Sequence, residues 1–365
     1  MISLAAVAFS LAVAWGCGAG QGTERLNPPG PATSAPPGDT VVFVSEGQGD
    51  RIAAYRLGTD GLMPEEPFST IEVDNPRRLI LRDDILYAAL SDGVVSISIN
   101  ADGSFPPDIS STTTPVININ PLDLELIGDF LYVAFEGIRS VSAYALEDGQ
   151  VPPLAISLSG TNLSSYTALS SRGRFLYAAA ANANRIDTYL VNDDGTLDPE
   201  PIPQSPQTRV SLPNDMVLLN GNLYIVSGDR RRIEQYDILN TGLLPRDPLT
   251  ETKRIEFYSR ILIVNDTIYA TAFNAGRTDL YGIDPGTGAI LTSKPFAKTF
   301  ADVSAFTNGI MIENGILYVT LSGRDRIDAH ILGADGVPAT FPSSSTNAIA
   351  GSFPNDLVSG IYPAP

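Results

Sequence analysis

Five charged residues occupy equivalent positions in a sequence that repeats itself. They are Arg78, Asp123, Asp215, Arg260 and Asp356, separated by about 45 residues or about twice that number. Arginine forks bind anionic groups in a bidentate manner, and a carboxylate can activate a water molecule as a general base. If the fold gathers these five side chains, they would form a polar site for a small anionic ligand.

The same charges also allow a purely structural interpretation. Arranged in a ring, Arg78 would lie between Asp356 and Asp123, and Arg260 would lie beside Asp215. Neighbouring charges would then neutralise one another, and ion pairs in a wet channel need no ligand to explain them. Both interpretations stay open at the level of the sequence.

The element that must position these charges is a short apolar segment built on a tyrosine. Residues 85–89 read Ile-Leu-Tyr-Ala-Ala, and residues 42–44 are a degenerate first copy of the same segment. Successive copies are 44 to 49 residues apart, and a period of this length indicates a repeat architecture. The key tyrosines are Tyr87, Tyr132, Tyr177, Tyr224, Tyr269 and Tyr318.

Each repeat contains four strand-like segments separated by turn residues, as around Gly128 and at the Asp148-Gly149 pair. Seven repeats of four short antiparallel strands predict an all-β, seven-bladed β-propeller over residues 40–363. The repeats begin on a second strand at residues 41–45 and end on a first strand at residues 353–358. We therefore expect the C-terminal strand to pair with the N-terminal blade and close the ring.

A second group of charges lies on the third strand of four repeats. Arg, an acid and an aromatic ring or histidine alternate there, so all three side chains point to one face of the strand. The pattern predicts either a basic collar that steers anions or an exposed ion pair within each blade, worth at most about 1 kcal/mol. The residues are Arg185, Asp187 and Tyr189; Arg232, Glu234 and Tyr236; Arg277, Asp279 and Tyr281; and Arg326, Asp328 and His330, with Arg51 as a further arginine.

Other reaction chemistry is poorly supported. His330 is the only histidine, and it takes the position where five other repeats have tyrosine, so we interpret it as a substituted structural aromatic. The sequence has no nucleophile elbow, phosphate-binding loop, paired cysteines or zinc-binding histidine pair. We predict no catalytic residue, cofactor or metal from these patterns.

Composition narrows the class of partner. Hydrophobic residues make up 43% of the 365-residue chain, which is enough for a sizeable core, and the net charge is −18. Such acidity argues against binding nucleic acid or adhering directly to anionic membrane surfaces. Partners at the predicted channel mouth would be an envelope protein, a glycan or a small anionic ligand.

The N-terminus suggests export. Residues 2–14 are mostly apolar and lead to Cys17, the only cysteine. Residues 1–17 resemble a bacterial lipoprotein signal peptide, which implies a signal at 1–16 and lipidation of Cys17; a plain secretory signal is the alternative. Residues 17–39 are rich in Gly, Pro, Ser and Thr and predict a flexible tether. The expected location is the bacterial outer membrane, the periplasm or the cell surface, with the lipid anchor as the only membrane contact.

Residues 41–363 resemble a known family. The Leu-Tyr-x-Ala strand, the Arg-Ile-x-x-Tyr third strand, the Asp-Gly turn and the Pro-initiated inner strand are similar to those of lactonase-type seven-bladed propellers. These include bacterial 6-phosphogluconolactonase-like proteins and the surface repeats named after a Tyr-Val-Thr-Asn motif. In the lactonase-like enzymes a Pro-Arg-His segment enters the channel. The matching stretch here is Pro76-Arg77-Arg78, with arginine in place of the histidine.

The resemblance implies three functions that the sequence does not separate. The first, which we favour, is a non-catalytic binding scaffold that is exported, lipid-anchored and active at the cell envelope. The second is a lactone hydrolase, with Arg78 and Arg260 holding an anionic substrate and a channel aspartate activating water. The third is a purely structural component of a surface complex.

Overall fold

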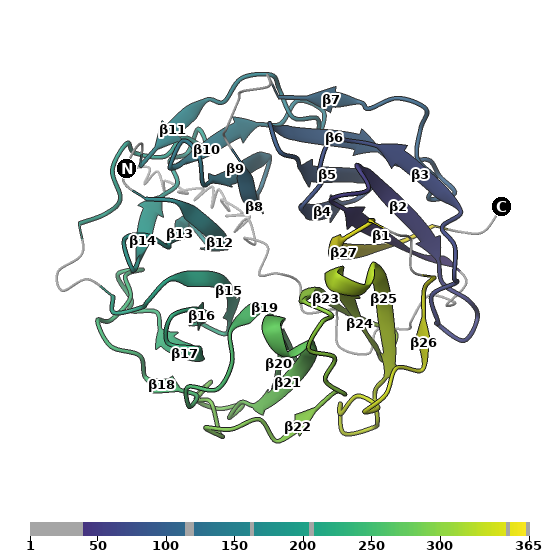
Figure 1. The fold of residues 1–365 in the computed structure, drawn as a ribbon. Coiled ribbons are helices and arrows are strands. Elements are labelled where there is room, and N and C mark those ends of the chain that lie inside the picture. Colours follow the sequence, from purple (N-terminus) through teal and green to yellow (C-terminus); the bar gives the residue numbers. More distant parts are fainter. Residues whose placement is uncertain (1–38, 114–119, 161–163, 204–207, 348–350, 363–365) are drawn as a thin grey trace, which may run out of the picture.

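A computed structural model of the protein describes residues 39–113, 120–160, 164–203, 208–347 and 351–362. These residues form seven antiparallel sheets arranged as a ring (Figure 1). We number the sheets as blades 1 to 7 in ring order and describe each from the innermost strand outwards. The predicted all-β, seven-bladed propeller is confirmed.

The bounds of the strands are as follows. Blade 1 contains β27 (Pro354–Ile361), β1 (Thr40–Glu46), β2 (Arg51–Arg56) and β3 (Ser69–Glu72). Blade 2 contains β4 (Arg78–Arg82), β5 (Ile85–Ala89), β6 (Val94–Ser98) and β7 (Ser111–Thr112). Blade 3 contains β8 (Pro121–Ile127), β9 (Phe130–Phe135), β10 (Ser140–Ala145) and β11 (Ser157–Ser159). Blade 4 shows three strands among the described residues, β12 (Tyr166–Arg172), β13 (Phe175–Ala180) and β14 (Arg185–Leu190).

The last three blades each have four strands. Blade 5 contains β15 (Pro213–Leu219), β16 (Asn222–Ser227), β17 (Arg232–Asp237) and β18 (Thr250–Glu251). Blade 6 contains β19 (Tyr258–Val264), β20 (Thr267–Ala272), β21 (Arg277–Gly282) and β22 (Ala297–Lys298). Blade 7 contains β23 (Thr307–Glu313), β24 (Ile316–Leu321), β25 (Arg326–Ile331) and β26 (Ser344–Ser345). Two short 3-10 turns, η2 (Phe273–Ala275) and η3 (Ser322–Arg324), follow β20 and β24.

The Leu-Tyr segments form the second strands, which are the most buried strands of the ring. Every residue of β16 and β24 is buried. A blade is covered on both faces by its neighbours, so its central strands have apolar residues on both faces instead of alternating with polar ones. Within the described ranges, no helix has the length and apolar character needed to cross a lipid bilayer.

The key tyrosine of each second strand links its blade to the next one. In six blades its hydroxyl donates a hydrogen bond to the carbonyl of the turn glycine in the following blade; Tyr132 to Gly195 (2.8 Å) is an example. These glycines have φ between 73° and 79°, a conformation that favours glycine. The other pairs are Tyr87 to Gly149, Tyr177 to Gly242, Tyr224 to Gly288, Tyr269 to Gly336 and Tyr318 to Gly61.

Blade 1 has Phe43 in place of the tyrosine, and the C-terminus fills this role. The ring of Phe43 lies 5.9 Å from that of Tyr362, edge to face. Arg56 donates to the carbonyl of Tyr362 (2.7 Å) and to the carbonyl of Asp102 in blade 2. The seam between blades 1 and 2 is therefore held by the end of the chain instead of a tyrosine hydroxyl.

Ring closure follows the predicted pairing. β27 pairs antiparallel with β1, with Leu357 opposite Val44 and Ile361 opposite Thr40. The backbone N–H of Tyr362 then donates to the carbonyl of Asp39 at 2.7 Å. The first and last described residues thus lie together at one end of blade 1.

Candidate functional site

The two ends of the ring differ in what they expose. At one end, which we call the entrance face, each inner strand begins and the loop between second and third strands turns. The two segments are hydrogen-bonded in each blade, as when the N–H of Phe273 donates to the carbonyl of Phe257 at 3.0 Å. The other end, the far face, consists of the tight hairpin turns and the glycine turns. Thr40 and Ile361 place both described chain ends at the far face.

The inner strands are irregular where they leave the entrance face. In the six blades other than blade 2, the pairing of the inner strand with the second strand skips one or two residues at this point. Such bulges re-aim a side chain and are common beside functional sites. The equivalent residue is partly exposed in all seven blades, namely Asn355, Arg77, Leu122, Thr167, Asn214, Ser259 and Asn308 in blades 1 to 7.

The sequence pattern did not reveal these bulge residues. Each lies one position before the charged or small residue of the predicted ring, and most are polar. Polar residues between Pro, Tyr or Thr and the apolar part of the inner strand are visible in the sequence. The skipped pairing appears only when the inner strand is aligned with the second strand. Burial lowers the pKa of Arg77 in this set, with Glu136 and Asp74 acting in the opposite direction.

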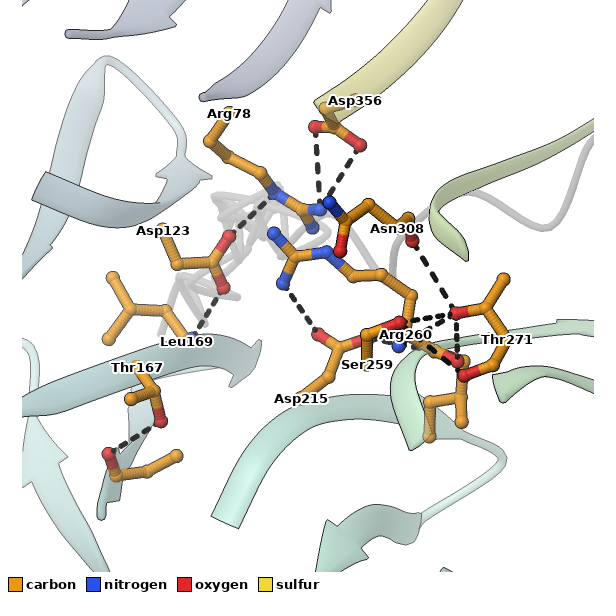
Figure 2. Close-up of polar contacts among 12 residues, drawn as sticks. Arg78, Asp123, Thr167, Leu169, Asp215, Ser259, Arg260, Thr271, Asn308 and Asp356 are labelled. Carbon is orange, nitrogen blue, oxygen red and sulfur yellow. Dashed lines mark hydrogen bonds and ion pairs between the residues drawn. The ribbon is translucent and has the colours of Figure 1, made fainter. Parts of the chain in front are cut away.

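The structure brings the five predicted charges together at the inner edges of blades 1, 2, 3, 5 and 6 (Figure 2). Arg78 lies between two carboxylates: its Nε is 2.7 Å from Asp123 Oδ1, and its Nη1 is 3.4 Å from Asp356 Oδ2. Arg260 Nη1 is 3.7 Å from Asp215 Oδ1. The predicted neighbour relations are therefore present.

Each carboxylate of this cluster also has a backbone partner in the following blade. Asp123 accepts from the N–H of Leu169 at 2.7 Å, and Asp356 accepts from the N–H of Leu79 at 3.0 Å. Asp215 accepts from the N–H of Ile261 at 2.9 Å. All three aspartates are buried. They are thus bridges between blades, a role that the sequence pattern did not reveal.

Arg260 differs from Arg78 in its surroundings. Its ion pair with Asp215 is longer than that of Arg78 with Asp123, and 18% of its side chain is exposed, against 10% for Arg78. Figure 2 shows the two guanidinium groups pointing toward each other. Burial first, and the positive charge of Arg78 second, lower the pKa of Arg260. An anion placed beside Arg260 would relieve this repulsion.

The third-strand charges form ion pairs within each blade, as one of the two interpretations expected. Arg185 Nε lies 2.5 Å from Asp187 Oδ1, and Arg277 Nε lies 2.7 Å from Asp279 Oδ1. The expectation of exposed pairs is wrong, because the acid is buried in all four blades. The remaining pairs are Arg232 with Glu234, Arg326 with Asp328, and Arg51 with Glu46.

His330 packs as a structural aromatic would. It is buried with 4% of its surface exposed, and its Nδ1 lies 2.8 Å from the carbonyl oxygen of Ala339, so the neutral ring donates its proton there. It lies on β25, away from the five charges at the inner strands. This placement agrees with its interpretation as a substitute for tyrosine.

Replacing His330 by tyrosine should remove a pH dependence of stability. Burial lowers the pKa of His330 from its usual value of 6.5, so the unfolded chain binds the proton more readily. The contribution is fully present above pH 6.5 and is lost as the pH falls towards the lower folded pKa. We expect the thermal midpoint of the wild type to fall between pH 7.5 and about 5.5, and that of H330Y to fall less.

The measurement is a melting curve followed by circular dichroism at several pH values. Because His330 is the only histidine in the chain, no other side chain of its type titrates in this window. Parallel midpoint curves for wild type and variant would contradict the prediction.

Two hollows lie outside the cluster. One of about 510 Å³ lies on the far face between blades 2 and 3, lined by Arg82, Asp129, Asp148 and Gly149 among others. The other, about 60 Å³, lies between blades 6 and 7 beside His330. Neither contains any of the five predicted site residues. Within the described part of the chain, no three His, Cys, Asp or Glu side chains converge as a metal site would require.

The predicted signal, tether and lipidated Cys17 lie outside the described residues, apart from Asp39 at the tether's end. No protein-family model matches the sequence, and no curated protein matches it either. Solved structures do match. The periplasmic gluconolactonase of Pseudomonas aeruginosa is 14% identical with a TM-score of 0.75, and the match covers 89% of this chain and 99% of that one.

Two further structures are similar. A Bacteroides fragilis protein assigned provisionally as a 6-phosphogluconolactonase is 15% identical with a TM-score of 0.72, covering 90% of this chain and 100% of that one. A Desulfotomaculum acetoxidans protein of unknown function is 10% identical with a TM-score of 0.67, covering 88% and 99%. The chain thus has the fold of the lactonase-like seven-bladed propellers. At these identities the similarity concerns the fold alone.

Proposed function

We propose that the chain is a non-catalytic binding module that takes an anionic ligand at the entrance face, beside Arg260 and Arg78. One observation supports this most directly: all three carboxylates of the cluster are buried and accept a backbone N–H from the next blade. A general base must reach a water molecule beside the substrate. Asp123, Asp215 and Asp356 are instead used to join blades, whereas Arg260 forms a 3.7 Å ion pair with Asp215 and faces the guanidinium group of Arg78.

We further propose that the module acts at the cell envelope, exported and lipid-anchored through Cys17. The apolar N-terminus and the Pro- and Gly-rich segment that follows support this. The described chain begins at Asp39 on the far face. A tether attached there would leave the entrance face pointing away from the membrane, accessible to an envelope protein, a glycan or a small anion.

A second candidate is a lactone hydrolase. It is favoured by the similarity to structures described as a gluconolactonase and a 6-phosphogluconolactonase. In that case Arg78 and Arg260 would hold the anionic substrate, and one channel aspartate would activate water at the cost of its structural bonds. The histidine of the family's Pro-Arg-His segment is Arg78 here.

The two candidates predict different results with the same protein. We expect the purified protein not to accelerate the opening of glucono-δ-lactone or 6-phosphogluconolactone above the buffer rate, measured as acid release at constant pH. We expect gluconate to bind in calorimetry, and Arg260→Met to weaken that binding at least about tenfold. A lactone-opening rate that disappears in Asp215→Asn would overturn the binding module in favour of the hydrolase.

A further inference from the structure

One residue of each blade, two positions before the bulge residue, lies at the entrance face. We call these seven residues the collar, and its two halves differ in polarity. The residue two positions before each bulge residue has its carbonyl, or that of the residue before it, hydrogen-bonded to the loop after the second strand. It therefore takes the same place in every blade. In blades 2, 3 and 4 it is polar, and in blades 5, 6, 7 and 1 it is apolar. The polar half is Asn75, Asn120 and Ser165, and the apolar half is Leu212, Phe257, Phe306 and Phe353.

Two residues of the apolar half, Phe257 and Phe306, form a continuous row of rings with Phe273 of η2, and we call these three residues the aromatic arc. The rings of Phe257 and Phe273 have centroids 6.2 Å apart at 69°, and those of Phe273 and Phe306 are stacked at 5.3 Å. Phe306 is 37% exposed, and the other two rings are partly exposed. Phe306 has a left-handed backbone conformation with φ 49°, which Asn75, Asn120, Leu212 and Phe353 share at the equivalent positions, so this conformation belongs to the repeated turn.

Polar side chains follow two positions after Phe257 and Phe306 on β19 and β23. They are Ser259 and Asn308, and Figure 2 shows both of them near Arg260. Ser259 Oγ is hydrogen-bonded to Thr271 Oγ1 at 2.9 Å, and Asn308 Nδ2 donates to Ser322 Oγ at 2.7 Å. Arg260 follows Ser259 on β19. From the rim inwards, blades 6 and 7 therefore present aromatic rings, then neutral hydroxyl and amide groups, then a guanidinium group.

Basic side chains lie next to the aromatic arc, on the side away from Arg260. Arg231, Lys253 and Arg254 are exposed, and the N–H of Ile255 donates to the carbonyl of Arg231 at 2.9 Å, so the two segments lie together just before Phe257. These three cations stand out in a chain with a net charge of −18. They would attract an anionic chain that extends beyond the arc.

We propose that the ligand is a carboxylate-bearing oligosaccharide that crosses the aromatic arc, an inference that rests on the proposed binding function. A sugar ring offers an apolar C–H face, hydroxyl groups at its edge and, in a uronic acid, a carboxylate. Those groups match the rings of Phe273 and Phe306, the polar groups of Ser259 and Asn308, and Arg260. The next uronate along the chain would meet Arg231, Lys253 and Arg254.

The test compares three probes by calorimetry at fixed ionic strength: an oligogalacturonate, neutral maltohexaose, and gluconate as the single acid. We expect the protein to bind oligogalacturonate at least about tenfold more tightly than gluconate, and maltohexaose weakly or not at all. The arc variant is Phe257→Ser with Phe306→Asn, which places in blades 6 and 7 the residues found in blades 4, 2 and 3. Phe341→Ala is the control, because that ring is 63% exposed on the outer wall.

The arc variant should bind gluconate as the wild type does and lose the additional affinity for the oligomer, whereas F341A should keep it. Equal binding of oligomer and gluconate, equal binding of maltohexaose, or an arc variant with unchanged affinity would each overturn this inference and leave the proposed function intact. If the wild type does not bind gluconate at all, the proposed function itself is rejected. Melting curves of both variants check that the collar substitutions leave the fold unchanged.

Discussion

A chain that lacks residues 353–365 is expected to lose cooperative folding. Removing these residues deletes β27, the strand that pairs with β1 and places Leu357 opposite Val44. Blade 1 is then left with an unpaired edge. The deletion also removes the buried Leu357 and Tyr362, the Tyr362 carbonyl that accepts from Arg56, and the Asp356 carboxylate that accepts from the N–H of Leu79 in blade 2. The combined loss should exceed about 5 kcal/mol, which is the lower range of total stability for a folded domain. Loss of a sigmoidal melting curve, with aggregation, is the expected result.

Two point variants on the same strand make this test quantitative. Leu357 is 3% exposed, so Leu357→Ala should cost about 2–5 kcal/mol in urea unfolding. Ile361 is 65% exposed at the far end of β27, so Ile361→Ala should change stability by less than about 0.5 kcal/mol. If the truncated chain melts at the wild-type temperature, the ring does not depend on the donated strand.

The sequence predicted the architecture because the period of the repeat is a direct consequence of the blade. The apolar Leu-Tyr segment, the turn glycine and the position of Leu357 are each visible one repeat at a time. The order of the repeats around the ring also predicted which charges are neighbours, and Arg78 lies between Asp123 and Asp356 as that order requires.

Features that join one blade to the next could not be predicted in the same way. The key tyrosine and the turn glycine are both visible in each repeat, but the hydrogen bond from the hydroxyl of Tyr132 to the carbonyl of Gly195 depends on how far one blade is rotated against its neighbour. The same holds for Asp123 and the N–H of Leu169. Asp187 and Asp279 are buried and accept hydrogen bonds from Tyr166 and Tyr258 on the inner strands of their own blades, a contact between distant strand positions that the local pattern did not reveal.

The collar was overlooked for another reason. Its members are not charged and do not form a motif, and Phe257, Phe306 and Phe353 would pass in the sequence as core residues before a strand. Only the hydrogen bonds that fix these positions at the entrance face show that they belong to one ring. Phe273 has no counterpart in that ring and joins the arc through η2 alone.

Asp123 allows the structural and ligand-binding interpretations of the central cluster to be separated. Replacing it by alanine removes the partner of Arg78 Nε at 2.7 Å and the acceptor of the Leu169 N–H, while both groups stay buried. Removing one member of a buried ion pair costs about 3–5 kcal/mol, and Arg78 would keep only its longer 3.4 Å contact with Asp356. We expect Asp123→Ala to lower the free energy of unfolding by about that amount in urea titrations.

Two further variants serve as comparisons for this prediction. Asp129 forms a 3.9 Å ion pair with Arg82 but has 91% of its side chain exposed, so Asp129→Ala should cost less than about 1 kcal/mol. The double variant Asp123→Asn with Arg78→Met removes both charges and keeps an oxygen that can accept from Leu169. It should be more stable than the sum of the two single variants predicts, because the cost of each single change is the charge it leaves behind. The opposite result would be a free energy of unfolding of Asp123→Ala within about 1 kcal/mol of the wild type, together with loss of gluconate binding. The carboxylate would then serve the ligand, and other contacts would join the blades.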